Sequence, residues 1–221
     1  MDRLRLLSLG GHALIASFVV SLAGGLAHPV VDGDAHSVAS LTAAASPYAQ
    51  ILIYVGALLL MFGLPAAYAW LAPHVGRLGF AGFSLYFLGN AVSAQGHLVV
   101  EAFVAPEIAR RAPELVPDDG SILDAPLFAT VQVVGGLVLV AGLVVLGVAL
   151  LRTPVVPRWI GIASIVAGVL AVTPLPEAPV LSGLQIELAR GLAVAGLGVL
   201  MIRRARVGSV DAVHTPMPRT A

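Results

Sequence analysis

The stretch "YAWLAPHVGRLGFAGF", residues 68–83, lies between two long apolar runs and decides how the chain is divided. Proline, glycine and arginine interrupt the apolar pattern here, as expected where one helix ends and the next begins. On each side the sequence stays apolar for at least the roughly 20 residues that a membrane-crossing helix needs. We therefore expect two spanning helices, 48–72 and 78–104, joined by a short connection.

The composition of the whole chain is that of a membrane protein. Of its 221 residues, 58% are hydrophobic and 11% are charged, and the mean hydropathy is +0.96. Soluble domains are about 45–50% apolar and about 25% charged. The formal net charge of zero leaves no basic surface for nucleic acid. The absence of cysteine excludes disulfides and thiolate metal ligands.

The same criterion predicts an all-α polytopic membrane bundle of about six transmembrane helices. They form a single domain, residues 1–204, followed by a polar tail, 205–221, that we expect to be disordered. Proline and glycine occur in nearly every connection. The predicted spans are 6–27, 48–72, 78–104, 126–151, 158–175 and 183–202.

Arginine placement predicts the orientation, because cytoplasmic loops carry an excess of basic residues. Arginines precede the first span, lie in the second and fourth connections, and follow the last span. The first and fifth connections have no arginine, and in the third connection five acidic residues outnumber two arginines. Both termini are therefore expected in the cytoplasm, in a multi-pass protein of the inner or plasma membrane.

The N-terminal segment has a second interpretation. Residues 1–29 have a basic start, an apolar core and small residues at the end, as in a cleaved signal peptide. The apolar core is long for that role, which favours a retained helix.

Small residues on the predicted helices indicate close packing. The fourth span carries Gly135, Gly136, Gly142 and Gly147, and the sixth pairs Gly191 with Ala195. Small residues let helix backbones approach closely in lipid. We expect these faces to make the bundle compact, and a homo-oligomer through the glycine-rich faces is the alternative.

Polar residues within the spans mark a candidate site, since such residues are costly in a bilayer and usually functional. In the third span, Asn90, His97 and Glu101 share one helical face. In the sixth, Glu187 and Arg190 are three residues apart and share another. Topology places both sets in the outer half of the membrane, together with further candidates for a ligand or proton pathway: Gln132, Tyr54 and Gln50.

The pairing of Arg190 decides between two interpretations of this cluster. Arg190 could neutralise either Glu101 or Glu187, leaving the other carboxylate free for proton exchange with His97. The alternative is a structural ion pair in a passive bundle. No zinc-protease, nucleophile-elbow or aspartate-rich motif occurs, and we expect no metal site.

Four functions fit these observations. The slightly favoured one is a small-molecule binding or transport protein with an outward-facing polar pocket for a small or amphipathic ligand. An intramembrane enzyme using a carboxylate acid on an isoprenoid-like substrate is the second, and an assembly subunit of a membrane complex is the third. The fourth is a b-type cytochrome, whose candidate haem ligands are His12, His28, His74 and His97; otherwise no cofactor is expected.

The segment "ALLRTPVVPRWIGIASIVAGVL", residues 149–170, carries a resemblance. It resembles the Pro-Arg-Trp-x-Gly hairpin of uncharacterised six-helix prokaryotic integral membrane proteins. The segments "AHP" at 27–29 and "EAFVAPEIA" at 101–109 look like those of similar small actinobacterial membrane proteins. The resemblance implies the six-helix topology and no activity.

Overall fold

The computed structural model describes the backbone of residues 3–117 and 125–214. All the regular elements in these residues are helices, which confirms the predicted all-α class. The long helices are α1 (Arg3–Ala27), α3 (Ser46–Ser93), α5 (Pro126–Leu151) and α7 (Leu181–His214). The shorter elements are α2 (Val38–Thr42), η1 (Ala94–Leu98), η2 (Val100–Val104), α4 (Ala105–Arg111), η3 (Pro113–Leu115) and α6 (Arg158–Leu170).

Four helical stretches in the described residues are long and apolar enough to cross a membrane. One of them is a continuous run from Ser46 to Arg111, which includes the sequence between the second and third predicted spans. Large apolar side chains lie exposed on the outer faces of the helices, which suits contact with lipid better than with water. On α5 these are Leu127, Val131, Val133, Val134 and Leu137.

The run from Ser46 to Arg111 folds into two antiparallel arms at Gly76. Gly76 has a φ of +57°, outside the helical region, and glycine adopts this conformation without steric cost. Contacts across the arms are centred on this turn. The Tyr68 ring packs on those of Phe80 and Phe83, and Asn90 donates a hydrogen bond to the Ala57 carbonyl at 3.1 Å. The predicted break near residues 73–77 is thus present.

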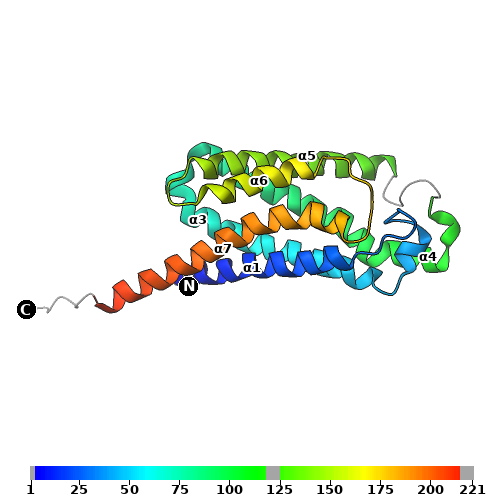
Figure 1. The fold of residues 1–221 in the computed structure, drawn as a ribbon, viewed down its shortest axis with the longest axis horizontal. Helices are drawn as coiled ribbons and strands as arrows, with labels where there is room; N and C mark the ends of the chain where they lie inside the picture. The colour runs from blue at the N-terminus through cyan, green and yellow to red at the C-terminus, as the bar shows by residue number, and fades with distance from the viewer. Residues whose placement is uncertain (1–2, 118–124, 215–221) are drawn as a thin grey trace, which may run out of the picture.

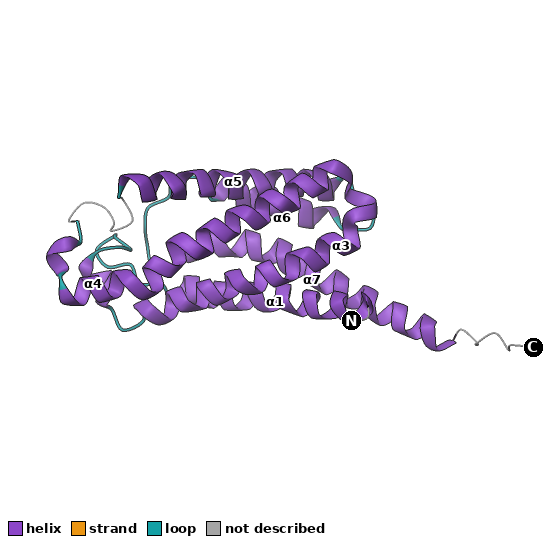
Figure 2. Ribbon diagram, turned by 180° about the vertical axis from the view of Figure 1, so that it is seen from behind, coloured by secondary structure: helices purple, strands orange, loops and turns teal. Residues whose placement is uncertain are grey.

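The helices form one bundle with a continuous core. α1 packs against α7 and the first arm of α3, while α5 packs against α3 and α6. α6 also contacts α7, which closes the bundle (Figures 1 and 2). Fully buried side chains at these contacts include Leu14, Leu71, Tyr86, Leu143 and Met201.

The two ends of the bundle differ in the segments that they carry. The N-terminus, the turn within α3 and the α5–α6 connection lie at one end (Figure 1). α2, α4 and the α6–α7 connection lie at the other end. The arginine-rich connections of the sequence therefore gather at the first end, and the acidic connections at the second.

α6 is shorter than the predicted span 158–175, and α7 is longer than the predicted span 183–202. Thirteen residues of α6 make a helix roughly 20 Å long, against the roughly 30 Å of a bilayer core. Prolines 174 and 176 follow it, and the Gln185 amide donates to the carbonyls of Leu170 and Thr173 at 2.8 and 2.7 Å. α7 continues to His214, so the predicted disordered tail begins as helix, and its residues 215–221 lie outside the described residues.

Most of the predicted packing glycines make contacts within the chain. A Cβ added at Gly142 would lie 2.3 Å from the Tyr86 backbone nitrogen, and one at Gly135 would meet Val92. Gly136 differs, because an added Cβ would meet nothing within 4 Å. These glycines therefore let α5 approach α3, whereas a homo-oligomer stays a prediction.

We expect Gly142→Ala to destabilise the protein, because the added methyl group meets backbone that cannot move aside. The expected loss is about 1–3 kcal/mol, as for overpacked cores. The matched control is Gly136→Ala, which should be neutral or stabilising by up to about 1 kcal/mol through helix propensity. Thermal unfolding in one detergent measures both; equal effects of the two substitutions would contradict the α3–α5 packing.

Candidate functional site: a histidine–glutamate cluster

The second arm of α3 ends in two π-helical segments, η1 and η2. A π segment inserts extra backbone into a helix, changes the direction of its side chains, and occurs frequently at functional sites. His97 lies in η1 and Glu101 in η2. The prediction of one face for Asn90, His97 and Glu101 assumed regular α-helix throughout, so the local geometry differs from the one expected.

Glu101 is a deeply buried carboxylate surrounded by imidazole rings. Its side chain is 4% exposed. Its Oε2 lies 3.0 Å from His97 Nε2, and its Oε1 lies 2.9 Å from His28 Nε2. A third ring, that of His36, places its Nε2 3.4 Å from Oε1. We call His28, His36, His97 and Glu101 the histidine–glutamate cluster.

The connection after α1 brings His36 to this carboxylate. Residues Asp32 and Gly33 adopt positive φ angles of 55° and 80° and turn the chain back, so that Val31 and Asp34 pair. The Asp34 carboxylate then accepts hydrogen bonds from the backbone of His36 and Ser37 at 2.6 and 3.1 Å. We call residues 31–37 the strap.

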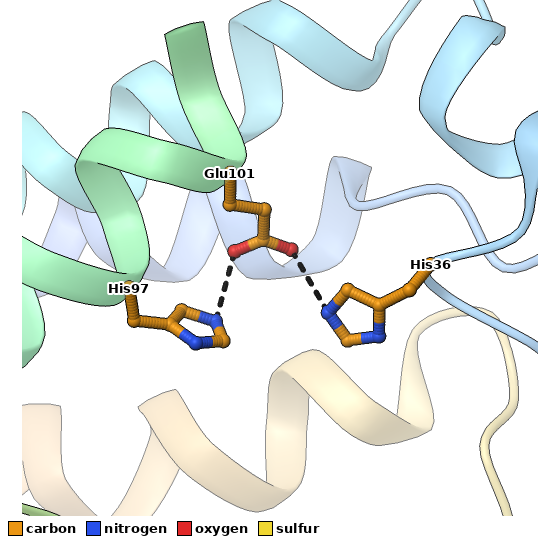
Figure 3. A group of neighbouring side chains, drawn as sticks. All are labelled: His36, His97 and Glu101. Atoms are coloured by element: carbon orange, nitrogen blue, oxygen red, sulfur yellow. Dashed lines mark ion pairs between the residues drawn. The ribbon is translucent and has the colours of Figure 1, made fainter. Parts of the chain in front are cut away.

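A second contact joins the strap to the α6–α7 connection. The Ala35 backbone N–H donates to Glu177 Oε2, in the α6–α7 connection, at 2.7 Å. Figure 3 shows the result: Glu101 points between His97 and His36, which come from different parts of the chain. The cluster therefore links α1, the strap and the second arm of α3.

The electrostatics of the cluster follow from the burial of Glu101. A buried carboxylate is costly unless charge or hydrogen bonds compensate it. An imidazole that carries its proton on Nε2 supplies such a bond, and His28 and His97 are at hydrogen-bonding distance. The interaction with Glu101 also raises the pKa of His36 above its ordinary value, against the opposing effect of burial.

One atom of the cluster lacks a hydrogen bond. His36 Nε2 is enclosed and has no hydrogen-bond partner of acceptable geometry, although it lies 3.4 Å from the carboxylate. Buried polar nitrogens almost always have a partner, and an exception points to a strained arrangement or to an additional ligand.

Arg190 pairs with Glu187, three residues earlier on α7, and the two side chains are 12% and 5% exposed. Of the two pairings considered for Arg190, the structure has the one that leaves Glu101 to the histidines. The Tyr86 hydroxyl is buried near this pair without a hydrogen bond. The charged side chains predicted to share one half of the membrane thus divide into an internally neutral ion pair and the histidine–glutamate cluster.

The remaining candidate residues lie around the cluster or away from it. Gln50 is 1% exposed, and its amide nitrogen lies 3.2 Å from Ser46 Oγ and 3.4 Å from His28 Nε2. Gln132 reaches over Gly96 from α5, and its amide nitrogen is buried without a partner. Tyr54 packs on Phe103. Asn90 holds the two arms of α3 together.

Two of the histidines considered as haem ligands face Glu101 in this structure. His28 and His97 both direct Nε2 at the same carboxylate. His12 is exposed and contacts the Ser8 carbonyl at 2.8 Å, and His74 is exposed near the α3 turn. A b-type haem stays a prediction that an absorption spectrum tests.

Neither spacing nor hydropathy singles out His36, the residue that completes the cluster. It lies in a polar connection, "DGDAHS", where histidine is unremarkable by spacing or hydropathy. The usable signal is the predicted topology, which places this connection on the same side as the His97–Glu101 end of the third predicted span. His28 is among the histidines considered as haem ligands, and in the structure its Nε2 faces Glu101 Oε1.

Three members of the cluster can hold a metal ion together. His36, His97 and Glu101 offer one ligand atom each, and these atoms lie within 4.8 Å of one another. Two ligands of a tetrahedral zinc ion, each about 2.0–2.1 Å from it, are about 3.3 Å apart. His97 Nε2 lies 3.0 Å from Glu101 Oε2 and His36 Nε2 lies 3.4 Å from Oε1, so a small movement of the side chains would bring one carboxylate oxygen and both imidazoles to that spacing.

Comparison of the chain with protein-family models, with curated proteins and with solved structures gives no match. The function must therefore be argued from the cluster itself.

Proposed function

We propose that this protein is a multi-pass membrane protein that binds one divalent transition-metal ion, such as Zn²⁺, through His36, His97 and Glu101. The observation that carries the proposal is the convergence of two imidazole nitrogens and a buried carboxylate within one ligand sphere. Imidazole and carboxylate are ordinary zinc ligands. The sequence analysis expected a polar pocket for a small ligand, and here that ligand is a metal ion. The expectation of no metal site is therefore replaced.

Metal binding also explains why imidazole Nε2 atoms are buried around Glu101. In the hydrogen-bonded arrangement, the imidazoles use Nε2–H groups toward Glu101; a metal ion would replace those protons, as metal binding to histidine generally does. The ion would give His36 Nε2 the partner that it lacks. It would also compensate the negative charge of Glu101, which Arg190 does not contact because it pairs with Glu187.

His28 supports the site without being one of its three ligands. Its Nε2 faces Glu101 Oε1, and its Nδ1 lies 3.2 Å from the Pro29 carbonyl. Hydrogen bonds to ligating carboxylates fix their orientation and raise metal affinity. His28 is therefore a positioning residue.

The proposal includes the membrane topology. The two arms of α3 cross as separate helices, α1, α5 and α7 cross singly, and the short α6 with its extended continuation makes the sixth crossing. The gathering of arginine-rich connections at one end of the bundle supports a cytoplasmic location for that end. The cluster then faces the outside of the cell membrane.

Zinc binding is tested with the purified, detergent-solubilised full chain by calorimetry and by metal analysis after gel filtration. We expect one Zn²⁺ per chain. His28→Gln should weaken binding about 10–100-fold, as loss of an outer-shell partner does, and His36→Ala, His97→Ala and Glu101→Gln should each weaken it further.

His12→Ala and His74→Ala are the matched controls, because both histidines are exposed and lie outside the cluster. Both should bind zinc like the wild type. Because His36 lies in the strap and not in a helix, His36→Ala should keep the melting temperature of the metal-free protein close to that of the wild type. Binding that survives every cluster substitution, or is absent from the wild type, refutes the proposal.

The orientation is tested by cysteine labelling, for which the absence of native cysteine gives a clean background. Thr42 and Arg77 are exposed at opposite ends. In intact cells a membrane-impermeant maleimide should label Thr42→Cys and leave Arg77→Cys unlabelled until the membrane is permeabilised. The reverse pattern would invert the topology.

A further inference from the structure

The number of protein ligands determines what a bound ion can do. Structural zinc sites are closed by four protein ligands, whereas catalytic sites have three and leave a position for water or substrate. In the described residues the group that can share an ion has three members: His36, His97 and Glu101. The question is whether a fourth donor stands nearby.

The neighbouring histidine and carboxylate side chains that could serve as a fourth ligand have other partners. His28 is outside the 4.8 Å group, and both its nitrogens face oxygen atoms of the protein. The Asp34 carboxylate holds the backbone of the strap, and Glu177 accepts from Ala35 N–H. Recruiting any of them would break hydrogen bonds that form this end of the bundle.

The exposure of the ligands indicates where the ion would be accessible. The Glu101 side chain is 4% exposed, whereas those of His97 and His36 are 34% and 25% exposed. The carboxylate therefore lies on the inner side of the site, and the two imidazole side chains are partly exposed although His36 Nε2 itself is enclosed. The rings of His97 and His36 are thus the part of the site nearest to solvent.

Charge identifies the kind of molecule that fits this position. A divalent ion with one carboxylate and two neutral imidazoles carries a net charge of +1. A single negative charge at the fourth position would neutralise this ligand shell, while Asp34 and Glu177 lie outside it and accept hydrogen bonds from the strap backbone. Hydroxide qualifies, since a zinc ion lowers the pKa of its bound water to about 7, and so does an external carboxylate.

We propose that the metal site is an open, three-ligand centre whose fourth position exchanges between water and a monoanionic oxygen or nitrogen ligand. This inference rests on the proposed metal-binding function and deepens it. A centre of this type binds or activates an external molecule, whereas a closed centre only cross-links the strap to the helices. A carboxylate-bearing molecule is the class of ligand that fits the charge of this ligand shell.

Cobalt substitution tests the inference, because Co²⁺ occupies zinc sites and its visible spectrum reports the ligand sphere, whereas Zn²⁺ has no such bands. The full-length protein is loaded with Co²⁺ and titrated with azide and, separately, with acetate. We expect a saturable change in the position and intensity of the visible bands with each anion. Perchlorate at equal ionic strength, a weakly coordinating anion, should leave the spectrum unchanged.

His28→Gln distinguishes an open site from one that His28 closes. If His28 only positions Glu101, the variant binds Co²⁺ more weakly, keeps the wild-type band positions once saturated, and still responds to azide. A loaded wild-type protein that ignores both anions, or a His28→Gln variant with a different saturated spectrum, overturns the open centre while leaving metal binding intact. Failure of the wild type to take up either Co²⁺ or Zn²⁺ overturns the proposed function itself.

Discussion

The polar end of this molecule depends on the burial of one carboxylate. Glu101 is 3% exposed at the end of a long apolar hairpin, where an isolated negative charge is strongly disfavoured. The chain compensates it with side chains from three separate places: the end of α1, the strap and the preceding turn of η1. Three parts of the chain thus converge on Glu101, beside the small apolar core that Leu41, Ala105, Ala109 and Val116 form at the same end of the bundle.

Glu187 and Glu101, two buried carboxylates, have different kinds of partner. Glu187 and Arg190 form a charge-balanced pair from one helix and need no further partner. Glu101 is surrounded instead by imidazoles, which can act as hydrogen-bond donors or as metal ligands depending on where their protons lie. If Glu101 had a purely structural role, an arginine partner would neutralise it more simply, because arginine stays charged at any physiological pH. The histidines favour a site that exchanges its ligand.

The sequence predicted much of the fold because apolar length and arginine placement are properties of continuous segments. Local spacing predicts the break near Gly76 and the helical hairpin around it. It also predicts the proximity of His97 and Glu101, which are four residues apart. The end of α6 could not be predicted in this way, since hydropathy continues past Leu170, whereas two prolines follow the helix and the Gln185 amide donates to the carbonyls of Leu170 and Thr173. Apolar character alone does not show where the backbone hydrogen bonds of a helix end.

The candidate site could be predicted only in part, for a related reason. His97 and Glu101 are four residues apart and remain in contact even though η1 and η2 are not α-helical. His36 arrives through the turn at Asp32 and Gly33 and the bond from Ala35 to Glu177. These are contacts across the fold, and neither spacing nor hydropathy encodes them. The sequence likewise left open whether Arg190 pairs with Glu101 or with Glu187, and only the side-chain geometry shows that the partner is Glu187.

The most direct measurement of the central claim, that His36, His97 and Glu101 form one ligand sphere, is zinc K-edge X-ray absorption of the zinc-loaded protein. The account predicts a first shell of nitrogen and oxygen atoms at about 2.0–2.1 Å, with the outer-shell scattering of two imidazole rings. His36→Ala should remove one of these rings from the spectrum. A shell of oxygen atoms without imidazole scattering would contradict the account.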